Sequence, residues 1–221
     1  LDAIMKAQQI ADLGFCHMLD YLKPGLTEKE AAFELEMFLR SHGADALSFD
    51  TILVSGVRTS LPHGTPSQKI LEKGDFITMD FGCAVDGYRS DMTRTVALGS
   101  ISAEQRNVYD IVMRAQTAGC NAIRSGLSCR EADRVCRDYI ADEGLGVFFG
   151  HGTGHGVGLE VHEAPTLNTK SDEILKENMV ITVEPGIYMP KKFGVRIEDL
   201  AIVTASGIIN LVKSDKELII L

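Results

Sequence analysis

The sequence lacks the features of a membrane, secreted or nucleic-acid-binding protein. Its 221 residues contain no apolar run that approaches the ~20 residues of a membrane-spanning helix. The first residues, Leu1-Asp2-Ala3, have neither the basic region nor the apolar segment of a signal peptide. Lys and Arg number 22 against 31 Asp and Glu, so the formal net charge is −9. An acidic chain argues against nucleic acid and anionic membranes as main partners.

Cysteines are too few and too scattered for a disulfide framework. They are odd in number and form no C-x-x-C pair: Cys16, Cys83, Cys120, Cys129 and Cys136. Reduced thiols in a cytoplasmic protein are the plain interpretation. No linker or low-complexity segment divides the chain, and 45% of its residues are hydrophobic. We therefore expect a single acidic globular domain over residues 1–221.

The most distinctive stretch is residues 150–163, Gly-His-Gly-Thr-Gly-His-Gly-Val-Gly-Leu-Glu-Val-His-Glu. It holds three of the six histidines, His151, His155 and His162, and has glycine at every second position from 150 to 158. Its spacing matches neither the dinucleotide-binding nor the P-loop motif. A flexible glycine linker is the alternative, but linkers rarely interleave histidine with glycine. We expect a metal or catalytic site whose acidic partners lie elsewhere in the chain.

Hydrophobic periodicity and capping signals predict an alternation of helices and strands. Capping boxes begin two of the helices, at Thr27–Glu30 and Ser128–Glu131. The expected helices are 2–22, 28–42, 102–124 and 128–143. The expected strands are 48–55, 76–82, 88–97, 179–184 and 194–203, with short apolar runs at 208–212 and 218–221.

A hairpin at Asp86-Gly87 brings two carboxylates together. If the turn is tight, Gly82 pairs with Asp91, and Asp80 lies on the same face as Asp91 along the diagonal. Diagonal side chains start ~7–8 Å apart, and their tips can come closer. Asp80 and Asp91 can therefore reach a common cation.

The two halves of the sequence repeat each other. The matching pairs, in chain order, are Gly25-Leu26-Thr27-x-x-Glu30-Ala31 with Gly126-Leu127-Ser128-x-x-Glu131-Ala132, His63-x-x-Pro66 with His162-x-x-Pro165, the strand ending in Asp80 with the strand ending in Glu184, and Asp91 with Glu198. His155 has no counterpart. We expect an α+β fold of two pseudo-twofold-related halves, with a mostly antiparallel curved sheet and outer helices. A site on the axis receives Asp80, Asp91, Glu184 and Glu198, with His63 and His162.

Each carboxylate alone could cap a turn or lie at the surface. Together, four converging negative charges would repel one another unless cations balance them, and two divalent ions would do so. Carboxylates with one imidazole suit Mn, Fe, Co or Zn. A pair of such ions can bridge a water and lower its pKa to near neutrality, making a nucleophile for a carbonyl carbon.

The sequence resembles the pita-bread dinuclear metallopeptidases, a family of methionine aminopeptidases, Xaa-Pro aminopeptidases and prolidases. The resemblance covers nearly the whole chain and includes all five metal-ligand positions. It implies that Asp80 binds one metal, that Asp91 and Glu198 bridge both, and that His155 and Glu184 complete the other. It also makes Glu184 a catalytic proton acceptor, and His63 and His162 catalytic residues that bind the substrate's peptide group. Among the metals, manganese is expected first, with Co, Zn or Fe as alternatives.

Three details resemble the Xaa-Pro branch of the family. They are His151-Gly-Thr-Gly-His155, Glu184-Pro-Gly-Ile-Tyr188, and Val195-Arg196-Ile-Glu198-Asp199. His151, Tyr188 and Arg196 are accordingly expected to bind substrate, although Arg196 could instead form a salt bridge with a ligand carboxylate. The resemblance implies hydrolysis of Xaa-Pro bonds in dipeptides or short peptides, by a metal-bridged hydroxide. A methionine aminopeptidase-type exopeptidase and a non-catalytic protein-binding module are the alternatives.

The resemblance also bears on what surrounds this domain. Its Xaa-Pro members carry an N-terminal domain before the catalytic one, and Leu1 falls near the first expected catalytic-domain helix. The chain is therefore expected to be the catalytic domain of a longer cytoplasmic protein that forms homodimers.

Overall fold

The computed structural model describes all 221 residues, and its elements follow the expected alternation. The helices are α1 (Asp2–Tyr21), α2 (Glu28–Ser41), α3 (Ala103–Ala122) and α4 (Cys129–Asp142), with short 3-10 turns η1 (Gly56–Ser60) and η2 (Gly146–Phe148). None of the helices combines the length and apolar composition needed to span a bilayer. Both predicted capping boxes are present, with the Thr27 and Ser128 hydroxyls accepting from the backbone N–H groups of Glu30 and Glu131.

Strands of the first half form two three-stranded antiparallel sheets. One has the order β2-β3-β6 and the other β1-β4-β5. Their bounds are β1 (Ala46–Leu47), β2 (Ile52–Ser55), β3 (Phe76–Phe81), β4 (Cys83–Val85), β5 (Tyr88–Arg89) and β6 (Met92–Ala97). The strands expected over 48–55 and 76–82 appear as β2 and β3, and the one expected over 88–97 is divided into β5 and β6. The short strands β1 and β4 lie outside the expected ranges.

Strands of the second half form a five-stranded sheet, β13-β12-β9-β7-β8, and the pair β10-β11. Their bounds are β7 (Gly154–Gly156), β8 (Glu163–Leu167), β9 (Val180–Val183), β10 (Gly186–Met189), β11 (Phe193–Arg196), β12 (Asp199–Val203) and β13 (Ile208–Asn210). The single strand expected over 194–203 is interrupted at Ile197 and Glu198. The run at 218–221 contributes one isolated bridge, between Ala97 and Ile220.

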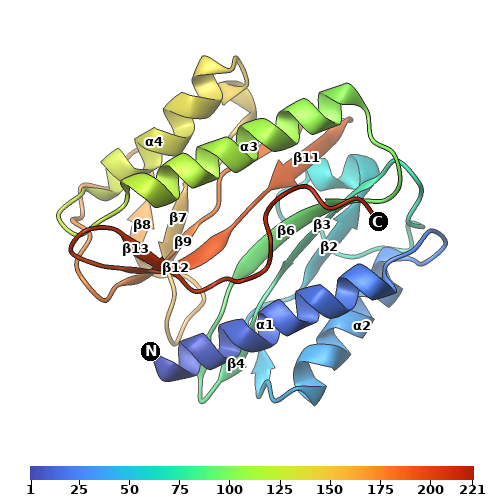
Figure 1. The fold of residues 1–221 in the computed structure, drawn as a ribbon, viewed down its shortest axis with the longest axis horizontal. Helices are drawn as coiled ribbons and strands as arrows, with labels where there is room; N and C mark the ends of the chain where they lie inside the picture. The colour runs from blue at the N-terminus through green and yellow to red at the C-terminus, as the bar shows by residue number, and fades with distance from the viewer.

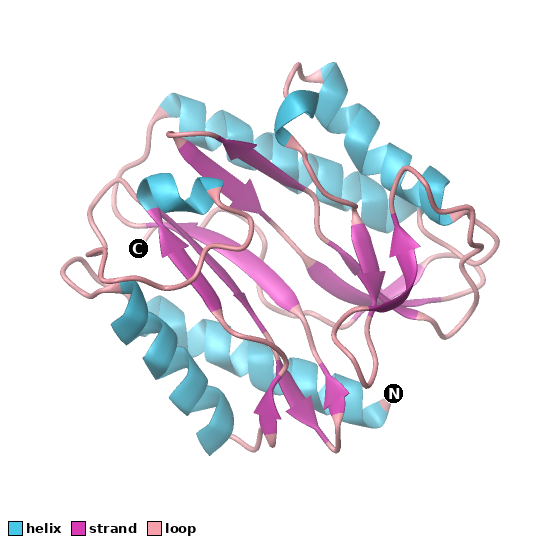
Figure 2. Cartoon of the chain, turned by 180° about the vertical axis from the view of Figure 1, so that it is seen from behind, coloured by secondary structure: helices cyan, strands magenta, loops and turns pink.

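The helices cover one side of these strands. In Figure 1, α1 and α3 cross the sheets and the C-terminal segment runs between them. Figure 2, seen from behind, shows the strands in front of α1 and α3. Two clusters of buried hydrophobic side chains fill the space between the layers, one mainly beneath α1 and α2 and the other mainly beneath α3 and α4. The opposite side of the strands is left for the cavity described below.

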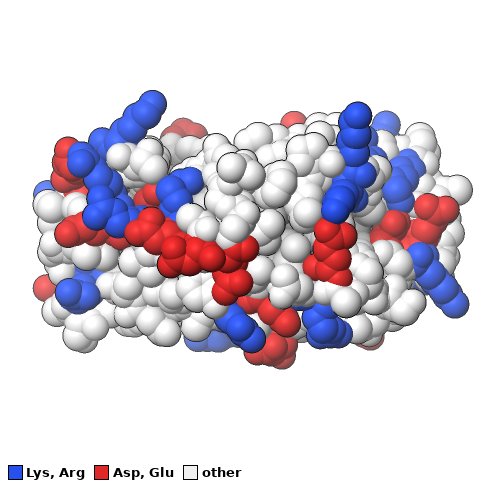
Figure 3. All heavy atoms as spheres, turned by 90° about the horizontal axis from the view of Figure 1, so that it is seen from above, with Lys and Arg blue, Asp and Glu red and all other residues white.

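The two halves meet where β6 lies against the junction of β11 and β12. The Glu198 N–H donates to the Thr93 carbonyl at 3.1 Å. The Thr95 hydroxyl donates to the Arg196 carbonyl at 2.9 Å. On the face of the molecule seen in Figure 3, acidic and basic side chains are interspersed, and no continuous basic patch covers it.

Candidate metal centre

A cavity of about 710 Å³ lies on the strand side, and none of its lining residues comes from α1 to α4. It brings together nearly all the residues singled out in the sequence. Those on its wall are His63, Asp80, Asp91, His151, His155, His162, Glu184, Arg196 and Glu198. Other lining residues, which the sequence did not single out, include Phe49, Asp50, Ile52, Pro62 and Thr65.

Asp80 and Asp91 reach the cavity from the hairpin as predicted. Val85 pairs with Tyr88 across the turn, and Phe81 pairs with Met92 beyond it, so one register runs through both sheets. Asp86 and Gly87 both have positive φ, at 50° and 81°, as the tight turn requires. The backbone thus holds Asp80 and Asp91 on one face.

Glu184 and Glu198 reach the cavity from the ends of β9 and β12. Asp199 pairs with Val183, so the same register carried one residue further places Glu198 opposite Glu184. Pro185 follows Glu184 directly, and the Glu184 N–H donates to the carbonyl of Thr153, the residue before β7, rather than to β12. The interruptions at the ends of β9 and β12 therefore aim both carboxylates into the cavity.

His155 lies on β7, between β8 and β9. A Cβ on the preceding Gly154 would overlap the Thr182 carbonyl, so glycine allows the close strand approach that this position needs. The His155 Nε2 lies 3.3 Å from Glu184 Oε1 and 3.6 Å from Asp91 Oδ2. Single ligand atoms of Asp91, His155 and Glu198 lie within 4.8 Å of one another.

The electrostatics of this cluster fit divalent cations. Burial, followed by repulsion from Glu198, Asp80 and Glu184, raises the pKa of Asp91 well above its usual range. Burial and neighbouring carboxylates likewise raise the pKa of Glu198 well above normal, and burial raises that of Glu184 to about 7. The buried Oδ1 atoms of Asp80 and Asp91 have no hydrogen-bond partner. Cations would satisfy both the charge and the orphaned oxygens.

Burial keeps the histidine of this group neutral, the form that binds metal. It lowers the pKa of His155 to about 4. The ring Nδ1 lies 3.1 Å from the Gly156 carbonyl oxygen, which leaves Nε2 directed at the carboxylates. A neutral imidazole fixed through its second nitrogen is the usual arrangement of a metal-bound histidine.

Arg196 forms the salt bridge that was the alternative to its substrate role. Its Nη2 donates to Asp80 Oδ2 at 2.5 Å, and its Nε donates to the Thr93 hydroxyl at 3.1 Å. Its Nη1 donates to the Tyr188 hydroxyl at 2.8 Å and to the Pro62 carbonyl at 3.2 Å. Four of its five N–H groups are thus already used within the protein.

Tyr188 and His151 differ from the expectation that both contact substrate. Tyr188 does not line the cavity, and its hydroxyl is shared between Arg196 and His151 Nε2, each at 2.8 Å. His151 does line the cavity, but its Nδ1 is 2.8 Å from the Gly152 carbonyl oxygen. Both ring nitrogens of His151 therefore have partners within the protein, which fixes the ring as part of the wall.

His63 and His162 are exposed side chains on the cavity wall, one from each half. The His162 ring packs edge-on against that of His155, with 4.4 Å between centroids. Neither ring forms a hydrogen bond within the protein, whereas the His151 ring bonds to the Tyr188 hydroxyl. They are thus placed to meet a bound molecule.

Thr93 is a site residue that the sequence analysis missed. Its hydroxyl donates to Glu198 Oε2 at 2.6 Å and accepts from Arg196 Nε. Asp91 and Thr93 are two residues apart in the strand expected over 88–97, and side chains at that spacing share a face. That alternation was the signal that could have identified Thr93.

The match to known proteins agrees with this geometry. Residues 2–205 match metallopeptidase family M24. The chain belongs to this family. Its pita-bread fold, with two related halves and outer helices, is the fold that the sequence implied.

The relatives of this M24 chain include proteins named for Xaa-Pro substrates. A Xaa-Pro dipeptidase of Pyrococcus furiosus is 42% identical over 99% of the chain and 63% of its own length. The structure of a Xaa-Pro dipeptidase from Bacillus anthracis is 52% identical, with a TM-score of 0.99 over 100% of the chain and 62% of the other. That of an X-Pro aminopeptidase from Thermotoga maritima is 40% identical, with a TM-score of 0.97 and the same coverage. The chain spans about three fifths of these relatives.

Proposed function

We propose that this chain carries the chemistry for hydrolysing the Xaa-Pro peptide bond at the N-terminus of dipeptides or short peptides. The observation that carries the proposal is the convergence of Asp80, Asp91, Glu184, Glu198 and His155 on one cavity. Relatives named Xaa-Pro dipeptidase and X-Pro aminopeptidase support the substrate class.

The five residues would hold two divalent metal ions, with manganese proposed first and Co, Zn or Fe as alternatives. When bound, the ions would supply Lewis-acid activation of a water and of the scissile carbonyl. Asp80, Asp91 and Glu198 would offer carboxylate oxygens to the ions, and Glu184 and His155, which lie 3.3 Å apart, would complete the ligand set.

Glu184 would also accept the proton of the attacking water. Its carboxylate lies on the cavity wall with the other four ligand residues, where a water activated by the ions would be within its reach. It could return that proton to the departing proline nitrogen. The same carboxylate would thus serve both transfers without moving.

His63 and His162 would hydrogen-bond the substrate's peptide group from opposite halves. Their exposed rings face one cavity, so a peptide between them could be held on both sides. As the carbonyl carbon becomes tetrahedral, an N–H donor placed there would stabilise the charge on its oxygen.

Arg196, Tyr188 and His151 would shape the subsite for the substrate's far end. Arg196 would contact the substrate through its one remaining N–H, and His151 through its ring face, because their other polar atoms have partners within the protein. Tyr188 would act through these two residues. We also propose a cytoplasmic location, which the five free cysteines favour, and a homodimer for the complete protein.

The test is a substrate panel on the metal-loaded protein. Gly-Pro, Leu-Pro and Leu-Pro-Gly-Gly should be cleaved at the peptide bond that precedes proline. Leu-Gly should be cleaved far more slowly. Methionyl peptides without proline separate the methionine aminopeptidase alternative. Cleavage of Met-Gly peptides in preference to all Xaa-Pro substrates would contradict the proposal. Retention of metal with no cleavage of any peptide would favour the binding-module alternative.

A further inference from the structure

Behind the cavity, a second buried ion pair joins the two halves. Arg94 follows Thr93 on β6, so its side chain points to the face opposite the cavity. It is only 1% exposed. Its partner is Asp199, which follows Glu198 at the start of β12 and accepts from Arg94 Nη2 at 2.7 Å. Neither residue lines the cavity.

All five N–H groups of Arg94 are used. Nη1 donates to the carbonyls of Thr93 at 3.0 Å and Glu198 at 2.5 Å. Nη2 also donates to the Ser214 carbonyl at 2.9 Å, and Nε donates to the Asp215 carbonyl at 3.0 Å. One guanidinium therefore binds β6, the residue before β12, and the C-terminal segment together.

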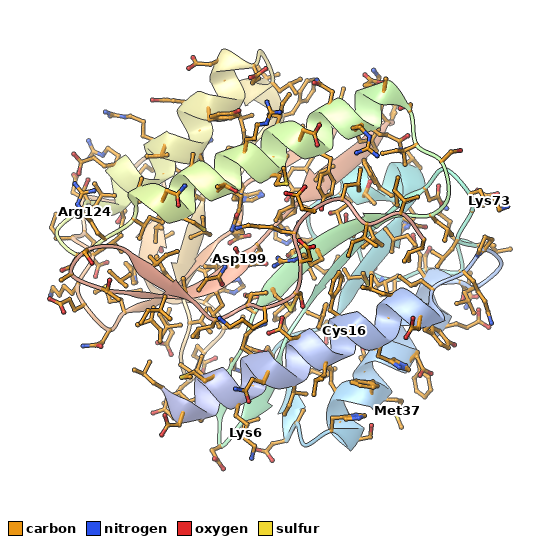
Figure 4. The ribbon with its side chains drawn as sticks, viewed as in Figure 1. Lys6, Cys16, Met37, Lys73, Arg124 and Asp199 are labelled. Carbon is orange, nitrogen blue, oxygen red and sulfur yellow. The ribbon has the colours of Figure 1, made fainter.

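The second carboxylate oxygen of Asp199 accepts hydrogen bonds from three further side chains. Its Oδ2 accepts from Lys216 Nζ and Gln116 Nε2, each at 2.9 Å, and from Asn210 Nδ2 at 2.8 Å. Lys216 Nζ also donates to Gln116 Oε1 at 2.7 Å. Figure 4 labels Asp199 near the centre of the view, beside the C-terminal segment that runs between α1 and α3.

Glu198 depends on this network because it has no sheet pairing of its own. It falls in the interruption between β11 and β12. Its backbone is held instead at both polar groups from β6, with its N–H on the Thr93 carbonyl and its carbonyl on Arg94. Its carboxylate is held on the cavity side by the Thr93 hydroxyl. Loss of Arg94 would remove the hydrogen bond to the Glu198 carbonyl. It would also remove a second donor to the Thr93 carbonyl, which accepts from the Glu198 N–H.

We propose that Arg94, with Asp199 and Lys216, positions Glu198 for metal binding, so that the C-terminal segment 211–217 helps to set metal affinity. The inference rests on the proposed function, because it takes Glu198 to be a metal ligand. Arg94 touches neither metal nor substrate and is a positioning residue. Partners of this kind typically contribute 10–100-fold to metal affinity.

The network could instead serve stability alone, and metal affinity separates the two roles. Metal-free protein would be titrated with Mn²⁺, following the free ion by electron paramagnetic resonance. Arg94→Met removes all five hydrogen bonds. Lys216 is partly exposed, and Lys216→Met removes one hydrogen-bond donor to Asp199 while Arg94 stays in place.

Leu35→Ala is the matched control for stability. Leu35 lies on α2, is fully buried in the hydrophobic cluster of the first half, and does not line the cavity. Its truncation should destabilise the fold by about 2–5 kcal/mol through the cavity it leaves. The thermal midpoint of this variant should fall while its Mn²⁺ affinity stays at the wild-type value.

Arg94→Met should weaken the looser Mn²⁺ site ~10–100-fold, and Lys216→Met should weaken it less. Wild-type affinity in both variants would overturn the inference. If Arg94→Met does not fold, Lys216→Met decides, and unchanged affinity there overturns it. A wild-type chain that binds two Mn²⁺ without cleaving Xaa-Pro peptides would defeat the proposed function, while weakened binding in the variants would still support the inference.

Discussion

The two halves of the chain build the same frame but differ in side-chain chemistry at several matching positions. In the first half Asp80 lies opposite Thr93, and in the second Glu184 lies opposite Glu198 in the continued register. Thr93 and Glu198 are therefore register equivalents, one a hydroxyl and the other a carboxylate. They hydrogen-bond to each other at 2.6 Å where the halves meet.

The same relation holds on either side of this pair. Two residues earlier, Asp91 of the first half corresponds to Arg196 of the second. One residue later, Arg94 corresponds to Asp199, and these two form a salt bridge at 2.7 Å. The repeat thus preserves backbone geometry while charge has diverged, so that one half complements the other. Counted along the strand registers, Asp91 falls opposite Gly82 and Glu198 opposite Glu184, so the two carboxylates that the sequence match paired lie two positions apart in register.

The largest expected effect comes from removing Glu198, the carboxylate at the junction of the halves. Glu198→Ala should lower kcat/KM by more than the ~10²–10³-fold ascribed to one transition-state hydrogen bond, and should weaken binding of at least one metal. The measurement is kcat/KM for Gly-Pro together with metal content. Near-wild-type turnover with both metals bound would contradict the assigned role.

Glu198→Gln separates charge from shape at the same position. Its metal-free form should melt no lower than metal-free wild type, because burial and neighbouring carboxylates disfavour the charged Glu198 and raise its pKa. Its metal affinity should still fall. Calorimetry with and without Mn²⁺ checks both, and a glutamine variant that binds metal normally would remove Glu198 from the ligand set.

The two cavity histidines test whether the halves act on substrate alike. His162→Ala should lower kcat by roughly 10²–10³, the size expected for one oxyanion-type hydrogen bond, with metal content intact. His63→Ala should show a similar loss if both rings hold the peptide group. A metal-deficient His162→Ala would instead make His162 a ligand, since its ring lies 4.4 Å from that of His155.

Thr93 offers a smaller test of the contact between the halves. Thr93→Val keeps the shape but removes the hydroxyl that joins Glu198 and Arg196. We expect a ~10-fold loss in metal affinity, at the low end for a partner of a metal ligand. Thr93→Ser retains the hydroxyl and should bind metal nearly as wild type does. Equal affinities for the valine and serine variants would show that the hydroxyl has no such role.

The smallest effect concerns the cysteines, which differ between surface and core. Burial raises the pKa of Cys83 to about 11 and those of Cys120 and Cys136 to about 12. Cys16 is exposed on α1. Iodoacetamide at pH 8 should therefore label Cys16 first, as peptide mass spectrometry would show, with little change in activity. Rapid labelling of Cys136 in folded protein would contradict its burial.

Much of this arrangement follows from local sequence signals. The helices were predicted to within a few residues, because hydrophobic periodicity outlines all four and capping boxes mark the starts of two. The Asp86-Gly87 turn fixed the hairpin register, and with it the shared face of Asp80 and Asp91. These features depend on residues close in the chain, where turn and capping chemistry decide the structure.

Features that depend on contacts between the halves could not be predicted in this way. In the strand break, the Glu198 backbone bonds to β6, a strand of the other half. The roles of Arg94 and Thr93 arise from partners more than a hundred residues away. Likewise, the Tyr188 hydroxyl is taken up by Arg196 and His151, which the spacing of the motifs did not indicate.

The most direct test of the account is to locate the metal itself. Crystals of the chain soaked in Mn²⁺ would be measured near the manganese absorption edge. We predict two anomalous peaks ~3.5–4 Å apart, the usual separation in two-metal sites, bounded by Asp80, Asp91, His155, Glu184 and Glu198. A cavity without peaks at saturating Mn²⁺, or peaks held by other residues, would contradict the claim that these five side chains form a dinuclear metal centre.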